Sequence, residues 1–90
     1  MNRVLIKNQE IDIPNTTVAA SSITSASAVR LVNVSDTNIR TVTVVAAPSG
    51  TVVGSFSILP RTVEYLEKNN AECIFSSASD IKCVKVGFTN

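Results

Sequence analysis

Residues that branch at Cβ dominate this chain and favour a sheet structure. Valine, isoleucine and threonine supply 13, 8 and 9 of the 90 residues, whereas leucine and alanine supply 4 and 8. Branching at Cβ restricts χ1 rotation, which suits a pleated, half-buried strand better than a helix. Apolar residues make up 44% of the chain, too much for a disordered polypeptide. The composition therefore predicts a compact all-β domain.

The length allows one such domain and no second core. We expect residues 1–90 to form a single β domain, with residues 1–27 as an N-terminal strand or arm with its connection, and residues 28–90 as the main β unit. Eight basic and seven acidic residues leave a net charge of +1. This balance argues against a protein built to bind nucleic acid or an anionic membrane surface, and no segment approaches the ~20 apolar residues that span a bilayer.

The N-terminal part is the least regular. Residues 3–7 and 11–13 are strand candidates, and Pro14 ends the second because proline has no amide hydrogen for a ladder. Residues 15–27 are rich in serine, alanine and threonine without clear periodicity. They predict an extended connection or a weakly specified strand, and either a flexible arm between subunits or a surface loop fits this composition.

A first hairpin is predicted from the apolar alternation after residue 27. Strands over 28–34 and 39–46 would place Leu31 opposite Val42, with a tight turn at Asp36-Thr37. Aspartate suits such a turn, although the glycine that usually follows it is missing.

The next hairpin has stronger turn chemistry. Pro48-Ser49-Gly50 matches a three-residue loop in which proline presets its own φ and glycine takes the left-handed position. Closing this loop places Val44 opposite Gly54 and Val42 opposite Phe56. We therefore predict a second hairpin with that register.

The C-terminal third predicts three further strands. Residues 62–67 are assigned to a strand, with a helix over 61–69 as the alternative because Glu64 and Lys68 have helical spacing. A two-residue turn at Asn69-Asn70 would lead into a strand over 72–75.

Residues 81–89 alternate, with one face made of Val84, Val86 and Phe88. Short strands with turns every eight to twelve residues predict a small antiparallel β-sandwich or barrel of about seven to eight strands.

The chain offers little catalytic or metal-binding chemistry, and we expect a non-enzyme. Histidine is absent, so a nucleophilic serine or cysteine has no imidazole base. Glu10 and Asp12 share a strand face, but a solvated surface explains them better than a catalytic pair. Two cysteines cannot complete a zinc shell. In the reducing cytoplasm expected for this chain, Cys73 and Cys83 are predicted to be free thiols, with a disulfide between neighbouring strands as the alternative. We assign no catalytic residue, metal or cofactor.

Several short strings in the distal two-thirds resemble small virion proteins of tailed bacteriophages, especially marine cyanophages. They are Val29-Arg30-Leu31-Val32-Asn33, Gly54-Ser55-Phe56, Glu64-Tyr65-Leu66-Glu67-Lys68 and Lys85-Val86-Gly87-Phe88-Thr89-Asn90. The resemblance implies a β-rich, non-enzymatic protein that is made in the host cytoplasm and sits in many copies on the virion.

Resemblance and composition together predict a capsid decoration (cement) protein. A small, valine-rich core buries little area, so we expect neighbouring chains to cover some strand faces or edges. Expected partners are the major capsid protein or other virion proteins, together with further copies in a homo-oligomer such as a trimer. We expect Val4, Ile6, Ile11 and Ile13 to form the interface with the shell, the alternative being that they cap the domain's own sheet. The other functional readings are a tail, neck or fibre component, and a binding module for a host protein or glycan.

Overall fold

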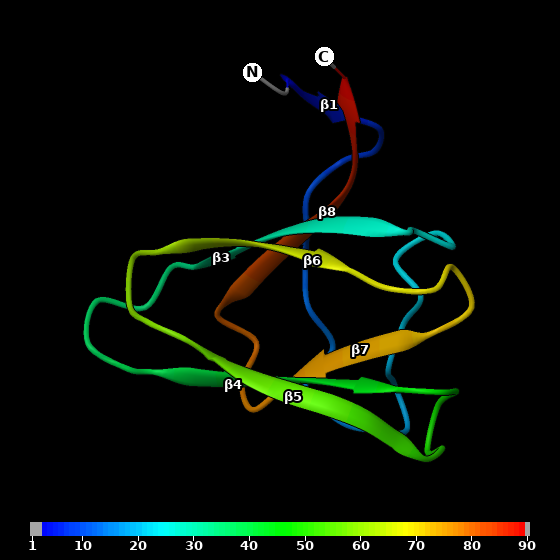
Figure 1. The fold of residues 1–90 in the computed structure, drawn as a ribbon. Helices are drawn as coiled ribbons and strands as arrows, with labels where there is room; N and C mark the ends of the chain where they lie inside the picture. The colour runs from blue at the N-terminus through cyan, green and yellow to red at the C-terminus, as the bar shows by residue number, and fades with distance from the viewer. Residues whose placement is uncertain (1–2, 90) are drawn as a thin grey trace.

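The computed structural model describes residues 3–89 and shows an all-β fold, with no helix in that range. Its eight strands are β1 (Arg3–Ile6), β2 (Ile11–Asp12), β3 (Ala28–Asn33), β4 (Arg40–Val45), β5 (Val52–Ile58), β6 (Val63–Glu67), β7 (Cys73–Ser76) and β8 (Ile81–Thr89). They form two antiparallel sheets that pack face to face, as Figure 1 shows. The predicted all-β sandwich is therefore confirmed.

The larger sheet is organised around β8. Its order is β1-β8-β3-β6, and β2 also pairs with β8, on the side away from β3. β3 pairs with residues 81–85 of β8, whereas β1 pairs with residues 86–89. The C-terminal end of β8 therefore extends beyond β3 and has only β1 as a neighbour.

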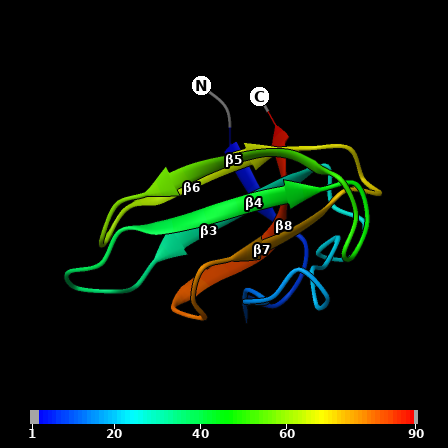
Figure 2. The same cartoon turned by 90° about the horizontal axis from the view of Figure 1, so that it is seen from below.

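The smaller sheet has the order β5-β4-β7, and Figure 2 shows β4 lying between its two neighbours. The predicted register is confirmed, because Val42 faces Phe56 and Val44 faces Gly54. A β-bulge between Val44 and Val45 shifts the pairing by one residue before the turn.

The core lies between the two sheets and is almost entirely aliphatic. One face of β3 contributes Val29 and Leu31, and the opposite sheet contributes Val42, Ile58 and Ile74, all fully buried. Phe56 and Leu66 pack against this cluster while remaining partly exposed. The period-2 alternation of the sequence thus marks two sheet faces that meet each other.

The predicted hairpin between 28–34 and 39–46 is wrong. β3 pairs with β6 and β8, and β4 lies in the other sheet, so Leu31 and Val42 belong to one core cluster but are not partners in a ladder. Asn33 explains the crossing. Its buried amide nitrogen donates to the carbonyl oxygens of Asn38 and Ile58, at 2.8 and 3.0 Å. The chain is therefore directed from the end of β3 toward the second sheet.

The strand predicted over 62–67 is confirmed and the alternative helix is wrong. The two-residue turn at Asn69-Asn70 is also wrong, because β6 pairs with β3 while β7 pairs with β4. The connection between β6 and β7 therefore crosses from one sheet to the other. Neither asparagine adopts a positive φ.

The turn between β4 and β5 differs from the expectation in one detail. Ser49, not Gly50, occupies the left-handed region, with φ of 57°. Gly50 is needed for another reason, since a Cβ there would lie 2.8 Å from the carbonyl oxygen of Ala47. The glycine therefore allows a close backbone approach, and the amide of Gly50 donates to that carbonyl at 2.7 Å.

Residues 15–27 lie against the body of the domain. Ala20, Ile23 and Ala26 are buried, and Ser21 forms an isolated bridge with Ile74 at the edge of β7. Residues 23–25 have successive φ values of 54°, 59° and 55°, which form a left-handed turn. This conformation costs roughly 1–2 kcal/mol per non-glycine residue, so surrounding contacts must hold it.

Candidate functional site

The ribbon made by β1 and the end of β8 is an exposed apolar part of the domain, as are Val52 and Val53 of β5, which are 60% and 57% exposed. Val4, Leu5 and Ile6 are 38%, 51% and 55% exposed, and Ile11 beside them is 46% exposed. β1 pairs only with β8, from Arg3 opposite Thr89 to Ile6 opposite Val86. Figure 1 shows this ribbon projecting from the sandwich. It therefore presents apolar side chains and an unpaired strand edge outside the body.

The structure separates the four residues expected at the interface. Val4, Ile6 and Ile11 lie on the surface, whereas Ile13 is only 2% exposed and belongs to the main core cluster. Assigning Ile13 to the interface was therefore wrong. Its amide donates to the carbonyl of Ile81 at 2.8 Å, which pulls the end of the N-terminal segment between the two sheets.

Leu5 was missed by the sequence analysis. Alternation along residues 3–7 gives Val4 and Ile6 one face and Leu5 the other, and a sheet that packs on the core buries one of its faces. In the ribbon both faces are open, because β1 extends past the body. Only the position of β1 relative to β3 reveals this, and no local pattern encodes it.

Two ion pairs hold the segment that follows β1. Glu10 pairs with Arg30 at 3.2 Å, and Asp12 pairs with Lys82. Because β8 lies between β3 and this segment, the Glu10–Arg30 pair crosses over β8 near Val84, which is 2% exposed. Glu10 and Asp12 were expected to lie on a solvated surface, and there each of them forms an ion pair with a basic side chain.

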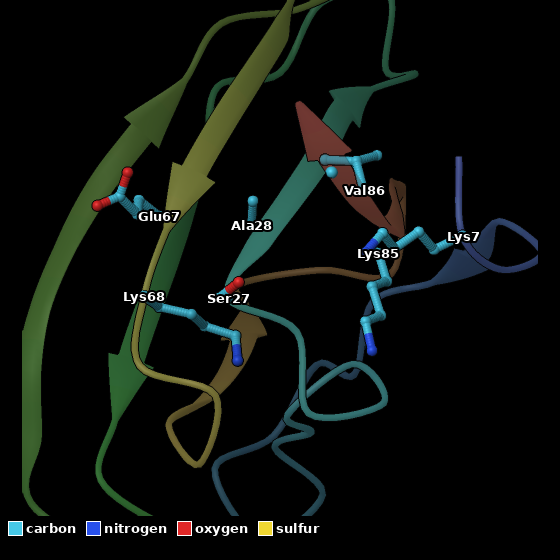
Figure 3. Close-up of a pocket in the computed structure, with 8 residues that line it drawn as sticks. Lys7, Ser27, Ala28, Glu67, Lys68, Lys85 and Val86 are labelled. Atoms are coloured by element: carbon cyan, nitrogen blue, oxygen red, sulfur yellow. The ribbon is translucent and has the colours of Figure 1, made fainter. Parts of the chain in front are cut away.

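A cavity of about 440 Å³ lies beside the base of the ribbon. Its lining is Lys7, Ser27, Ala28, Glu67, Lys68, Lys85, Val86 and Gly87. In Figure 3 the side chains of Lys7 and Lys85 lie together on one side of the cavity, and Lys68 lies on the other. The cavity is therefore lined by three basic side chains contributed by three separate segments.

The ammonium of Lys68 is buried among carbonyl oxygens. The side chain is 7% exposed, and Nζ donates to the carbonyls of Ser22, Ala26 and Glu72 at 2.9, 2.7 and 2.7 Å, with a longer bond to Asn69. Burial lowers the pKa of Lys68, while the nearby Cys73 and Glu72 act in the opposite direction. This cation joins the left-handed turn to the β6–β7 connection.

The two cysteines lie inside the domain. Cys73 and Cys83 are free and buried, as expected. Burial raises the pKa of the Cys83 thiol to about 12, so it remains protonated near neutral pH and is a poor nucleophile. Within residues 3–89 no group of three or more histidine, cysteine, aspartate or glutamate side chains could hold a metal ion.

Comparison with protein-family models finds no match, and neither the curated proteins nor the solved structures give a significant match. No helix in the described part of the chain is long and apolar enough to cross a membrane.

Proposed function

We propose that this chain is a non-enzymatic structural protein of a phage virion, a capsid decoration protein that binds the shell through its β1–β8 ribbon. The observation that carries the proposal is the projecting ribbon, in which Leu5 and Ile6 are more than half exposed on opposite faces. Consecutive exposed apolar residues are unfavourable in water unless a partner covers them.

The core between the sheets is complete within one chain, and the ribbon differs from other exposed apolar residues, such as Val52 and Val53 of β5, because it projects from the body. The aliphatic side chains between the sheets are buried within one chain, whereas the ribbon has no second layer. A neighbouring protein can pair with the free edge of β1 and cover its apolar side chains at the same time. The resemblance of residues 28–90 to small phage virion proteins supports the capsid as that neighbour.

Repetition would make a small contact sufficient. A ribbon of this size buries too little area for tight binding by a single copy. A homo-oligomer that places several ribbons on adjacent capsid subunits would bind by avidity. Many such contacts across the joints between subunits would resist the outward pressure of packaged DNA.

Co-sedimentation with purified capsids of the phage that encodes the chain tests this proposal. The double variant Leu5→Ser/Ile6→Ser should lower affinity by about 10- to 100-fold, because burying a large aliphatic side chain contributes roughly 1.5–3 kcal/mol when it is complete. The matched control is Val52→Ser/Val53→Ser on the edge strand β5, where both valines are similarly exposed, at 60% and 57%. This control should bind like the parent chain.

Two results would overturn the proposal. One is a folded parent chain that remains in the supernatant at every capsid concentration. The other is equal loss of binding in the ribbon variant and the β5 variant, which would show that the ribbon has no special part in docking.

A further inference from the structure

The lysine-lined cavity contains an unbalanced group of positive charges. Four of the basic side chains described by the structure form ion pairs: Arg30 with Glu10, Arg40 with Asp80, Arg61 with Asp36, and Lys82 with Asp12. The other three described basic side chains are Lys7, Lys68 and Lys85, which form no ion pair with a described carboxylate and which all line this cavity.

Lys7 and Lys85 are held together by the backbone. The amide of Lys7 donates to the carbonyl of Lys85 at 3.0 Å, so the two residues continue the β1–β8 ladder directly opposite each other. Like charges in such a cross-strand position repel and destabilise the pair. An anion bound between the two ammonium groups would relieve this repulsion.

Gly87 has no side chain, and the side chain of Lys7 occupies the space that one would need. A Cβ at Gly87 would lie 2.8 Å from Cε of Lys7 and 3.4 Å from its Nζ. The lysine side chain therefore lies across the glycine, along the cavity wall. The missing side chain at position 87 thus keeps the Lys7 ammonium close to the cavity.

Glu67 is the acidic residue of the lining, and it does not compensate the charges of Lys7 and Lys85. Glu67 belongs to β6, and in Figure 3 its carboxylate points away from Lys7 and Lys85. Lys68 adds a third positive charge at the opposite side, although its own donors are used by backbone carbonyls. The ammonium of Lys85 donates one hydrogen bond to the carbonyl oxygen of Thr24, at 3.1 Å. This bond fixes the position of the ammonium and leaves its other N–H donors available.

We propose that this cavity binds the phosphate group of a small phosphorylated ligand, held between Lys7 and Lys85. Lysine acts as a point charge with several donors. A phosphate dianion carries more charge than a carboxylate and offers more acceptor oxygens to two ammonium groups. The volume of about 440 Å³ exceeds that of a phosphate alone and lies within the usual range for small-molecule sites.

A small ligand fits better than a nucleic-acid strand. A strand needs a continuous line of unpaired cations, usually with aromatic side chains on which bases stack. Here Arg30, Arg40 and Arg61 are engaged in ion pairs, and no aromatic residue lines the cavity. Among the described side chains, the basic groups without an ion pair are therefore confined to one place.

Titration of the isotopically labelled full chain with pyrophosphate, at ionic strength held constant with sodium chloride, tests the site. NMR shift changes should concentrate on the amides of Ser27, Ala28 and Gly87. The variant Lys7→Gln/Lys85→Gln should bind at least tenfold more weakly. The matched control is Lys82→Gln, which lies on the same strand β8 but faces the other way and pairs with Asp12; it should bind like the parent chain.

A third variant and a second ligand sharpen the test. Gly87→Ala should weaken pyrophosphate binding by displacing the Lys7 side chain, and its melting temperature reports whether it is folded. Pyrophosphate shifts no larger than those of chloride would overturn the proposal, as would an equal loss in Lys82→Gln. Binding of a single-stranded oligonucleotide without binding of pyrophosphate would also overturn it, in favour of a nucleic-acid surface.

Discussion

Lys68 places a positive charge inside a small β domain, and no carboxylate of the described residues lies within salt-bridge reach of it. Its ammonium replaces water with the carbonyl oxygens of two separate turns. A buried charge that makes several hydrogen bonds to backbone oxygens can persist where an unpaired charge could not. The residue therefore holds together segments that follow different strands.

The variant Lys68→Met should destabilise the domain by about 2–3 kcal/mol, because it leaves buried carbonyl oxygens without a donor. The methionine side chain retains most of the apolar length, so the loss isolates the ammonium group. Urea unfolding followed by circular dichroism measures the change. The control Lys82→Met removes an exposed, ion-paired lysine and should cost less than about 1 kcal/mol. Equal costs for the two variants would show that the carbonyl contacts of Lys68 contribute nothing.

At the scale of elements, the turn between β4 and β5 gives the left-handed conformation expected of Gly50 to its neighbour. Ser49 takes the left-handed conformation, and Gly50 takes the close backbone contact with Ala47. The amide of Ser49 also donates to the carbonyl of Thr17 at 2.9 Å, which ties this turn to the 15–27 segment. Tertiary contact thus fixes the backbone of the loop.

Substitutions at these neighbouring positions should have opposite effects. Ser49→Gly should stabilise the domain by up to about 1 kcal/mol. Glycine adopts a left-handed φ without the steric cost that serine bears, and the additional backbone entropy that glycine loses on folding offsets only part of this gain. Gly50→Ala should destabilise it, because the new Cβ meets backbone atoms of Ala47 at 2.8 and 2.9 Å. Thermal unfolding of both variants measures the signs. Stabilisation by Gly50→Ala would contradict this account of the turn.

Local patterns predicted the elements well and their partners poorly. Apolar alternation located β3, β4 and β8, and the register of β4 with β5 followed from a short turn. The two wrong hairpins have strands whose apolar faces meet across the core, a relation that alternation cannot distinguish from pairing in one sheet. The buried amide of Asn33 and the buried ammonium of Lys68 direct the chain between sheets in these two connections.

The two candidate sites were predictable from the sequence to different degrees, because local patterns do not show which segments are neighbours in space. The exposed part of the N-terminal segment was expected from its separation from the main unit, yet Ile13 lies in the core. The lysine cavity could not be anticipated, since its lining comes from four segments distant in the chain. Only the backbone hydrogen bond between Lys7 and Lys85 reveals that these two residues are cross-strand neighbours.

At the scale of the whole molecule, the domain has a closed body and an open extension. The two sheets bury their aliphatic residues against each other, while β1 and the end of β8 leave the body with apolar residues on both faces. Native β proteins usually shield such edges with charges, proline or a covering element. The exposed ribbon is therefore a place where association with another chain would add stability.

If copies of the chain associate through their ribbons, stability must depend on concentration. A tenfold increase in protein concentration favours a folded dimer by about 1.4 kcal/mol, which corresponds to a rise of several degrees in the melting temperature of a domain of this size. Scanning calorimetry over two orders of magnitude in concentration, with light scattering for mass, measures this effect. Leu5→Ser/Ile6→Ser should abolish the dependence, whereas Val52→Ser/Val53→Ser should keep it. A monomeric parent chain with a constant melting temperature would exclude self-association and leave a different protein as the partner of the ribbon.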